Sequence, residues 1–126
     1  MKRTMLLSIA TLAFSALLAA PGFAQNPNTS GAGPGVVDPG HPRVNEVNQR
    51  QQNQQDRIAN GEKSGALTPH ESAKLERQQA RIDRSEKRDM AEHNGHLTKR
   101  EQHNLNRRQN RASANIYNKK HNDVVR

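Results

Sequence analysis

Two segments in the second half of the chain carry apolar residues at helical spacing. On a helical wheel, which turns by about 100° per residue, these positions gather on one side, within about 80° in the first segment. The pattern predicts two amphipathic helices, one from Pro69 to about Glu92 and one from residue 99 to about Lys120. Their narrow core-facing stripes contain Leu75, Gln79, Ile82, Glu86 and Met90 in the first helix and Leu105, Gln109, Ala112 and Ile116 in the second.

The local sequence marks where these helices start and where the first one stops. Thr68 precedes Glu71 by three residues, and Thr98 precedes Glu101 in the same way. Each pair is typical of a capping box, in which the two side chains bond the free backbone N–H groups at a helix start. The Asn94-Gly95 dipeptide supplies the left-handed residue that ends a helix.

The region before Pro69 changes character near residue 43. Residues 25 to 43 hold most of the Gly and Pro and are predicted to be a disordered linker. Farther on, Val44, Val47 and Ile58 fall at helical offsets around a polar tract of Gln and Asn. They predict a first helix over residues 44 to 60, and a solvated, partly disordered segment is the alternative.

One unit of sequence occurs twice, thirty residues apart. The stretch from Gly65 to Arg81 matches the stretch from Gly95 to Arg111 at 8 of 17 positions. Because repeated units usually bury one another's apolar faces, we expect an all-α fold over residues 44 to 122, with three helices built from two loop-helix repeats. Residues 123 to 126 are expected to be a tail. So few core residues give a marginal monomer, which a homo-oligomer or a partner would stabilise.

The chain begins like an exported protein. Lys2 and Arg3 precede an apolar run of 16 residues, and the small residues Gly22 and Ala24 follow it. This order predicts a signal peptide over residues 1 to 24, cut after Ala24. The run is shorter than the roughly 20 residues that span a bilayer, so no transmembrane anchor is expected after cleavage. The sequence therefore predicts a periplasmic or secreted protein.

The charge of the exported chain points to anionic partners. Removing Lys2 and Arg3 leaves 18 basic and 12 acidic residues, a net charge of +6. We expect the partner to be an anionic envelope surface or another envelope protein. Nucleic acid is not expected, because Tyr117 is the one aromatic residue after Ala24 and bases would have nothing to stack on. With no cysteine and no recognisable nucleophile–base set, the chain is not expected to be an enzyme.

Arginine residues form a stripe opposite the apolar one. Their spacing of four, three and four residues predicts a continuous cationic ridge, and the guanidinium group suits phosphate and carboxylate. A solvated face, interleaved with Asp83 and Glu86, is the alternative. The anion-binding residues that the sequence predicts are Arg77, Arg81, Arg84 and Arg88 in one helix and Arg100, Arg107 and Arg111 in the other.

The repeated Gly-x-Leu-Thr-x-x-Glu segment resembles the second half of an EF-hand loop, with Gly at position 6 and Glu at position 12. In the second copy Met90 occupies the first ligand position, and a thioether does not bind a hard cation such as Ca²⁺. A capped glycine turn without metal, in which Leu67 and Leu97 pack together, is the alternative. In the first copy the resemblance implies a weak Ca²⁺ site whose ligands are Asn60, Glu62, Ser64, Thr68 and Glu71.

The Leu-Thr pairs at the helix starts also resemble small exported bacterial helical proteins that sense envelope stress, bind metal or act as chaperones. Those proteins carry Leu-Thr-x-x-Gln, where this chain has Glu71 and Glu101. The chain as a whole is similar to small secreted bacterial helical proteins with repeated Gly-x-Leu-Thr-x-x-Glu units, a resemblance that implies no activity.

His93 and His96 are spaced as a chelating pair for a borderline metal, and ordinary surface histidines are the alternative.

These observations predict a non-catalytic exported helical protein that binds anionic surfaces of the envelope through its arginine ridge. A calcium-responsive EF-hand-like module, confined to the first loop, is the first alternative. A periplasmic stress or metal-binding protein with chaperone character is the second.

Overall fold

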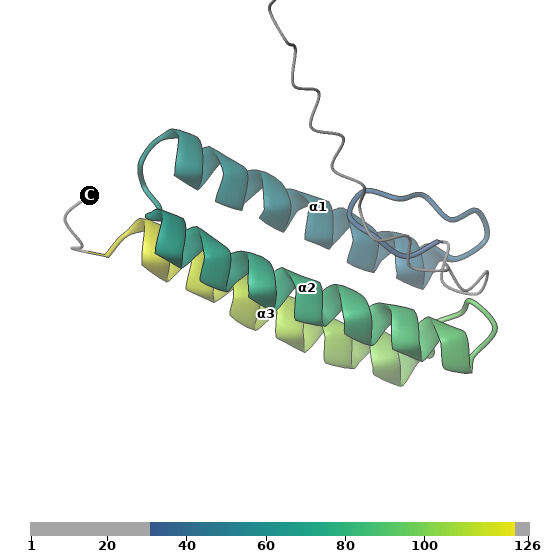
Figure 1. Cartoon of the computed structure of the whole chain (residues 1–126). Helices are drawn as coiled ribbons and strands as arrows, with labels where there is room; N and C mark the ends of the chain where they lie inside the picture. The colour runs from purple at the N-terminus through teal and green to yellow at the C-terminus, as the bar shows by residue number, and fades with distance from the viewer. Residues whose placement is uncertain (1–30, 123–126) are drawn as a thin grey trace, which may run out of the picture.

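The computed structural model describes residues 31 to 122 as a bundle of three helices (Figure 1). These are α1 (Pro42–Lys63), α2 (Pro69–Glu92) and α3 (Lys99–Lys120), joined by short turns. They hold 74% of the described residues, which contain no strand. The predicted all-α fold is confirmed. The predicted signal peptide, the first part of the predicted linker and the predicted tail at 123 to 126 lie outside the described residues. No helix within residues 31 to 122 is long and apolar enough to cross a membrane.

Both predicted capping boxes are present with the same geometry. Thr68 Oγ1 accepts the backbone N–H of Glu71 at 3.2 Å, and the Thr68 N–H donates to Glu71 Oε2 at 2.9 Å. Thr98 and Glu101 repeat the two distances at the start of α3. Each box satisfies two of the N–H groups that a helix start leaves without a backbone partner. The duplicated sequence therefore encodes duplicated helix starts.

Helix α1 is longer than the sequence predicted. It begins at Pro42 and runs through Gly61 to Lys63, so the Gln- and Asn-rich tract is helical. Gly61 does not end the helix; it leaves room for Leu67, whose Cδ1 would lie 2.6 Å from a Cβ atom built at this position. The chain turns at Gly65, where φ is 73°, in the left-handed region that favours glycine.

The part of the expected linker that the structure describes, residues 31 to 41, packs against α1 as an ordered loop. Asn48 is fully buried and fastens this loop. Its Oδ1 accepts the Gly33 N–H at 3.0 Å, and its Nδ2 donates to the carbonyls of Gly31 and Val36 at 2.7 and 2.9 Å. A disordered linker does not account for these residues, because one side chain satisfies three of their backbone groups.

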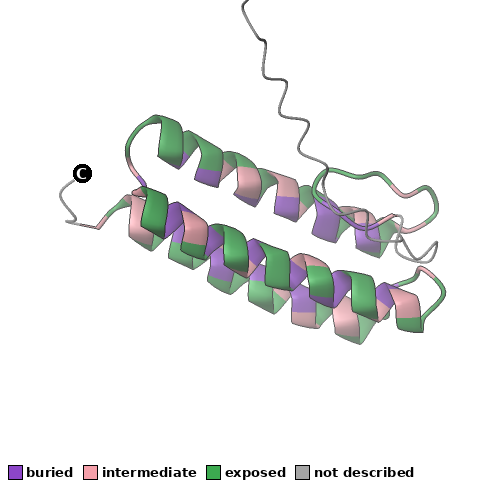
Figure 2. Cartoon of the chain, in the orientation of Figure 1, coloured by how far each residue is buried: buried purple, intermediate pink, exposed green. Residues whose placement is uncertain are grey.

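The residues on the predicted wheel faces line the interior of the bundle (Figure 2). All five positions of the α2 stripe and all four of the α3 stripe are buried, including the polar Gln79, Glu86 and Gln109. Apolar contacts form two clusters toward opposite ends. The larger cluster contains Ala32, Val44, Val47, Ile82, Met90, Leu97, Leu105 and Ala112, and the smaller contains Ile58, Leu67, Leu75 and Ile116.

Between these clusters, buried glutamine side chains from all three helices donate hydrogen bonds to another glutamine or to backbone carbonyls of a neighbouring helix. Gln79 Nε2 donates to Gln54 Oε1 at 2.8 Å, and Gln54 Nε2 donates to the backbone carbonyl of Gln109 at 2.8 Å. Gln109 Nε2 in turn donates to the carbonyl of Val47 at 2.9 Å. These three glutamines, which we call the amide layer, tie α1 to α2 and α3. Since buried amides are costly unless bonded, the layer constrains how the helices align.

Candidate functional site

Helices α2 and α3 run antiparallel and are joined along one edge of their contact by pairs of polar side chains. Asn115 Nδ2 donates to Gln78 Oε1 at 3.1 Å, and Arg108 Nη1 donates to the Ser85 hydroxyl at 3.0 Å. Asn122 donates to Glu71 in the same way. Successive pairs are seven residues apart in both segments, which keeps them on one seam of two packed helices; Asn122 itself lies two residues beyond the end of α3. We call these three pairs the polar ladder.

A cationic groove lies along this seam. Two adjoining depressions of about 330 and 200 Å³ share Gln78 and Arg81 in their walls. The first is lined by five residues of α2 and two of α3, namely Lys74, Leu75, Arg77, Gln78, Arg81, Asn115 and Lys119. The second adds Ile82, Arg108 and Arg111. No carboxylate lines either depression. The six cations that line the groove are Lys74, Arg77, Arg81, Arg108, Arg111 and Lys119.

Most of these cations carry no counter-charge from the described chain. Within residues 31 to 122, Lys74, Arg77, Arg81 and Arg111 form no ion pair with a carboxylate. Arg108 donates to a neutral hydroxyl. Cations held close together without acids raise the local positive potential and concentrate anions from solution. The groove is therefore suited to phosphate or carboxylate groups, which the guanidinium fork binds through two N–H groups at once.

The predicted arginine ridge is exposed along its whole length, but the structure does not gather it into one site. Arg77, Arg81 and Arg111 line the groove. Arg88 instead lies 3.2 Å from the carboxylate of Asp89. Arg107 donates to Asn104 at 2.7 Å. The remaining predicted residues, Arg84 and Arg100, are exposed outside the groove.

Three of the six cations that line the groove were not predicted from the sequence. Arg108 and Lys119 flank the apolar stripe of α3 rather than oppose it, so a search for the face farthest from the core passes over them. Lys74 lies outside the run of arginines that defined the ridge. Flanking positions of two packed helices meet at the edges of their shared seam. The positions of these cations can be read from the sequence, but recognising that they share a groove requires knowing that α2 and α3 are neighbours.

The five residues predicted to bind calcium span the end of α1, the turn and the start of α2. Asn60 and Glu62 lie within α1, and Ser64 follows its last residue. Thr68 and Glu71 form the capping box, and Glu71 also accepts from Asn122. An EF-hand holds its first ligands on a non-helical loop, whereas here α1 occupies these positions. Any calcium must compete with the cap, and binding stays a prediction.

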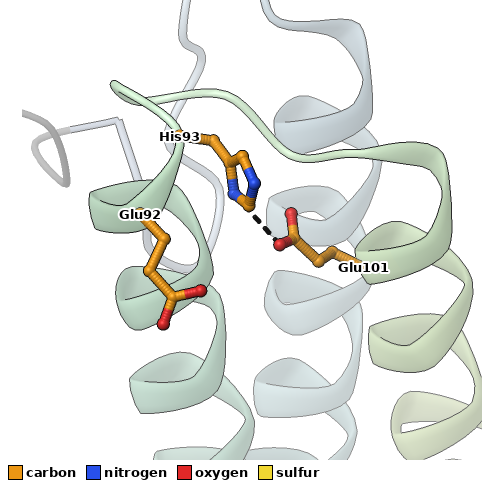
Figure 3. A group of neighbouring side chains, drawn as sticks. All are labelled: Glu92, His93 and Glu101. Carbon is orange, nitrogen blue, oxygen red and sulfur yellow. Dashed lines mark ion pairs between the residues drawn. The ribbon is translucent and has the colours of Figure 1, made fainter.

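The two histidines of the spaced pair point to different partners. His93 Nδ1 lies 3.0 Å from Glu101 Oε1. His96 packs its ring against His41, with 4.4 Å between ring centroids. The structure thus separates the predicted His93–His96 pair. It brings His93 together with Glu92 and Glu101 instead (Figure 3).

Comparison of the chain with protein-family models, with curated proteins and with solved structures gives no match. The description of this protein therefore rests on its own structure: an all-α bundle of three helices with a cationic groove between α2 and α3.

Proposed function

We propose that this chain is a non-catalytic exported protein that binds an anionic surface of the cell envelope through the α2–α3 groove. The observation that carries the proposal is the grouping of six cations, with no carboxylate among the lining residues. Export is inferred from the basic start, apolar run and small residues of the first 24 positions.

The dimensions of the groove favour a surface with many charges over a single small anion. Its lining positions on α3 run from Arg108 to Lys119, a distance of about 16 Å at 1.5 Å per residue. Electrostatic screening acts over about 8 Å at physiological salt. Neighbouring cations therefore act together, and successive phosphate or carboxylate groups can each find a partner along the groove.

Binding to vesicles tests the proposal, with the chain from Gln25 to Arg126 as the predicted mature form. We expect this chain to bind vesicles that contain about one third phosphatidylglycerol and not to bind neutral phosphatidylcholine vesicles. Binding should weaken steeply as salt is raised, because it depends on charge. Alginate, a carboxylate polymer, serves as a second probe and distinguishes a polysaccharide from a lipid headgroup as the source of the anion.

The arginines allow a control of equal charge. The first variant changes three groove residues to Gln and removes half of the positive charge of the groove; these residues are Arg77, Arg81 and Arg111. The control removes the same charge from exposed positions outside the groove, by changing Arg84, Arg100 and Arg107 to Gln. We expect the first variant to bind at least about tenfold more weakly than the second. Equal losses in the two variants would show that net charge, and not the groove, attracts the surface.

A further inference from the structure

The polar ladder between α2 and α3 has a fourth step that differs chemically from the other three. Glu71–Asn122, Gln78–Asn115 and Ser85–Arg108 each join a donor to an acceptor. Another step of seven residues along both helices leads to Glu92 and Glu101. Two carboxylates face each other at this step, and neither can donate a hydrogen bond when ionised. The two negative charges repel each other, and a cation between them removes this repulsion.

No basic side chain of the helices supplies this cation. Within the described part of the chain, no Lys or Arg forms an ion pair with Glu92 or Glu101. Arg88, one turn away on α2, is 3.2 Å from Asp89 instead. What enters the space between the two helices is the imidazole of His93, the residue that follows the last residue of α2.

The three side chains converge from both sides of the Asn94-Gly95 turn (Figure 3). One ring nitrogen of His93 and one oxygen each of Glu92 and Glu101 all lie within 4.8 Å of one another. The two oxygens of Glu101 are divided between two tasks. Oε2 accepts the Thr98 N–H at 2.9 Å and holds the helix cap, while Oε1 faces His93 Nδ1 at 3.0 Å.

We propose that Glu92, His93 and Glu101 bind a divalent transition-metal ion, with Zn²⁺ as the ion that suits them best. Imidazole nitrogen and carboxylate oxygen are both common zinc ligands, at about 2.0–2.2 Å. The separation of His93 and Glu101 already suits two ligands of one ion. The exposed Glu92 side chain closes the remaining gap by a change of rotamer, and water completes the coordination. This site lies at the end of the seam and is independent of the cationic groove.

The opposite end of the bundle provides a matched comparison within the same chain. His121 follows the last residue of α3 as His93 follows that of α2, and the Nδ1 atom of each contacts the backbone carbonyl four residues earlier. The ring of His121 stacks on Tyr117, however, with centroids 4.1 Å apart. The nearby ladder step is Glu71–Asn122, which pairs a carboxylate with an amide and not with a second carboxylate. We expect this end to bind zinc weakly or not at all.

Calorimetric titration of the chain from Gln25 to Arg126 with zinc chloride, near pH 7.5, tests the proposal. His93→Ala and Glu101→Gln should each lower the zinc affinity at least about tenfold. The matched variants His121→Ala and Glu71→Gln should bind as the parent does. The Glu→Gln changes keep the helix caps, because Gln also completes a capping box. Affinity should fall on acidification, since imidazole must be neutral to bind metal.

Two further variants keep the test decisive. Glu92→Gln changes an exposed residue outside the caps, so it should lose zinc affinity with its helical circular dichroism unchanged. His96→Ala should keep the affinity, because this ring packs on His41 and not on His93. The proposal is overturned if zinc binds equally well to His93→Ala and to the parent. It is also overturned if His96→Ala loses zinc as fully as His93→Ala, which would return the site to the spaced histidine pair.

Discussion

Gln51 of α1 donates a hydrogen bond of 2.7 Å to the carboxyl group of Glu86 in α2, and both side chains lie inside the bundle. Glu86 has no exposed surface, and Gln51 has 1%. Burial raises the pKa of Glu86 from its ordinary value of 4.5 to about 8. The hydrogen bond from Gln51 opposes this shift, and the charge of Asp83 adds to it. Glu86 is therefore largely protonated at neutral pH.

The first prediction is that the bundle loses stability as the pH rises. The folded state holds a proton on Glu86 that the unfolded chain releases above about pH 4.5. The stability that protonated Glu86 contributes to the folded state is thus complete below pH 4.5 and is lost as the pH rises through about 8. Between these values the loss approaches about 1.4 kcal/mol per pH unit. Urea unfolding at pH 5, 6.5 and 8 should show the decline. The variant Glu86→Gln, which keeps an acceptor for Gln51, should remain nearly constant, and equal slopes for the two proteins would contradict the assignment.

The second prediction concerns the amide layer. Gln54→Leu leaves the Nε2 group of Gln79 without its acceptor in the interior, so we expect a loss of about 1–3 kcal/mol in the free energy of unfolding. Replacing both residues with Leu removes both halves of the bond and should recover much of that loss. A double-mutant cycle by urea unfolding measures the difference. Additive losses would show that the two amides do not depend on each other.

The third prediction concerns the loop of residues 31 to 41. Asn48→Ala removes three hydrogen bonds to backbone groups of this loop, and we expect it to lower the free energy of unfolding by about 1–3 kcal/mol. Limited proteolysis should then cut the loop faster while α2 and α3 stay intact. Asn53→Ala, an exposed change on the same helix, is the control. Unchanged cleavage in Asn48→Ala would show that other contacts hold the loop.

The fourth prediction concerns calcium. We expect any Ca²⁺ binding to be weak and confined to the first loop, because Glu71 is already engaged by its cap and by Asn122. Titration with calcium should show Glu71→Ala losing what binding there is and Glu101→Ala keeping it. Both changes remove half of a capping box, so damage to a helix start is common to the two variants. Equal loss in both would exclude a specific first-loop site.

The sequence predicted those features that depend on neighbours along the chain. Thr68 and Glu71 are three residues apart, so their capping box follows from local geometry alone. The faces of α2 and α3 were likewise predictable, down to the buried Gln79, because the helical period fixes which positions share a side. The length of α1 was predicted less well, since Gly61 resembles a helix end until Leu67 is seen to pack against it.

Features that depend on contacts between helices could not be predicted in this way. The cationic groove combines Lys74 with Lys119, and the zinc proposal combines Glu92 with Glu101; both require the antiparallel alignment of α2 and α3. The ordered loop was missed because its Gly and Pro content is typical of disorder. What orders it is Asn48, which reaches back 15 residues to bond Gly33.

The amide layer has a consequence for how the molecule opens. It interrupts apolar contact between the two clusters, and the cluster of Ile58, Leu67, Leu75 and Ile116 has half as many members as the other. A short apolar cluster at one end allows local unfolding at a lower free energy than global unfolding. Backbone amides near the α1–α2 turn and the last turns of α3 should therefore exchange hydrogen with solvent first. The end that contains the Asn94-Gly95 turn should stay closed until the whole bundle unfolds.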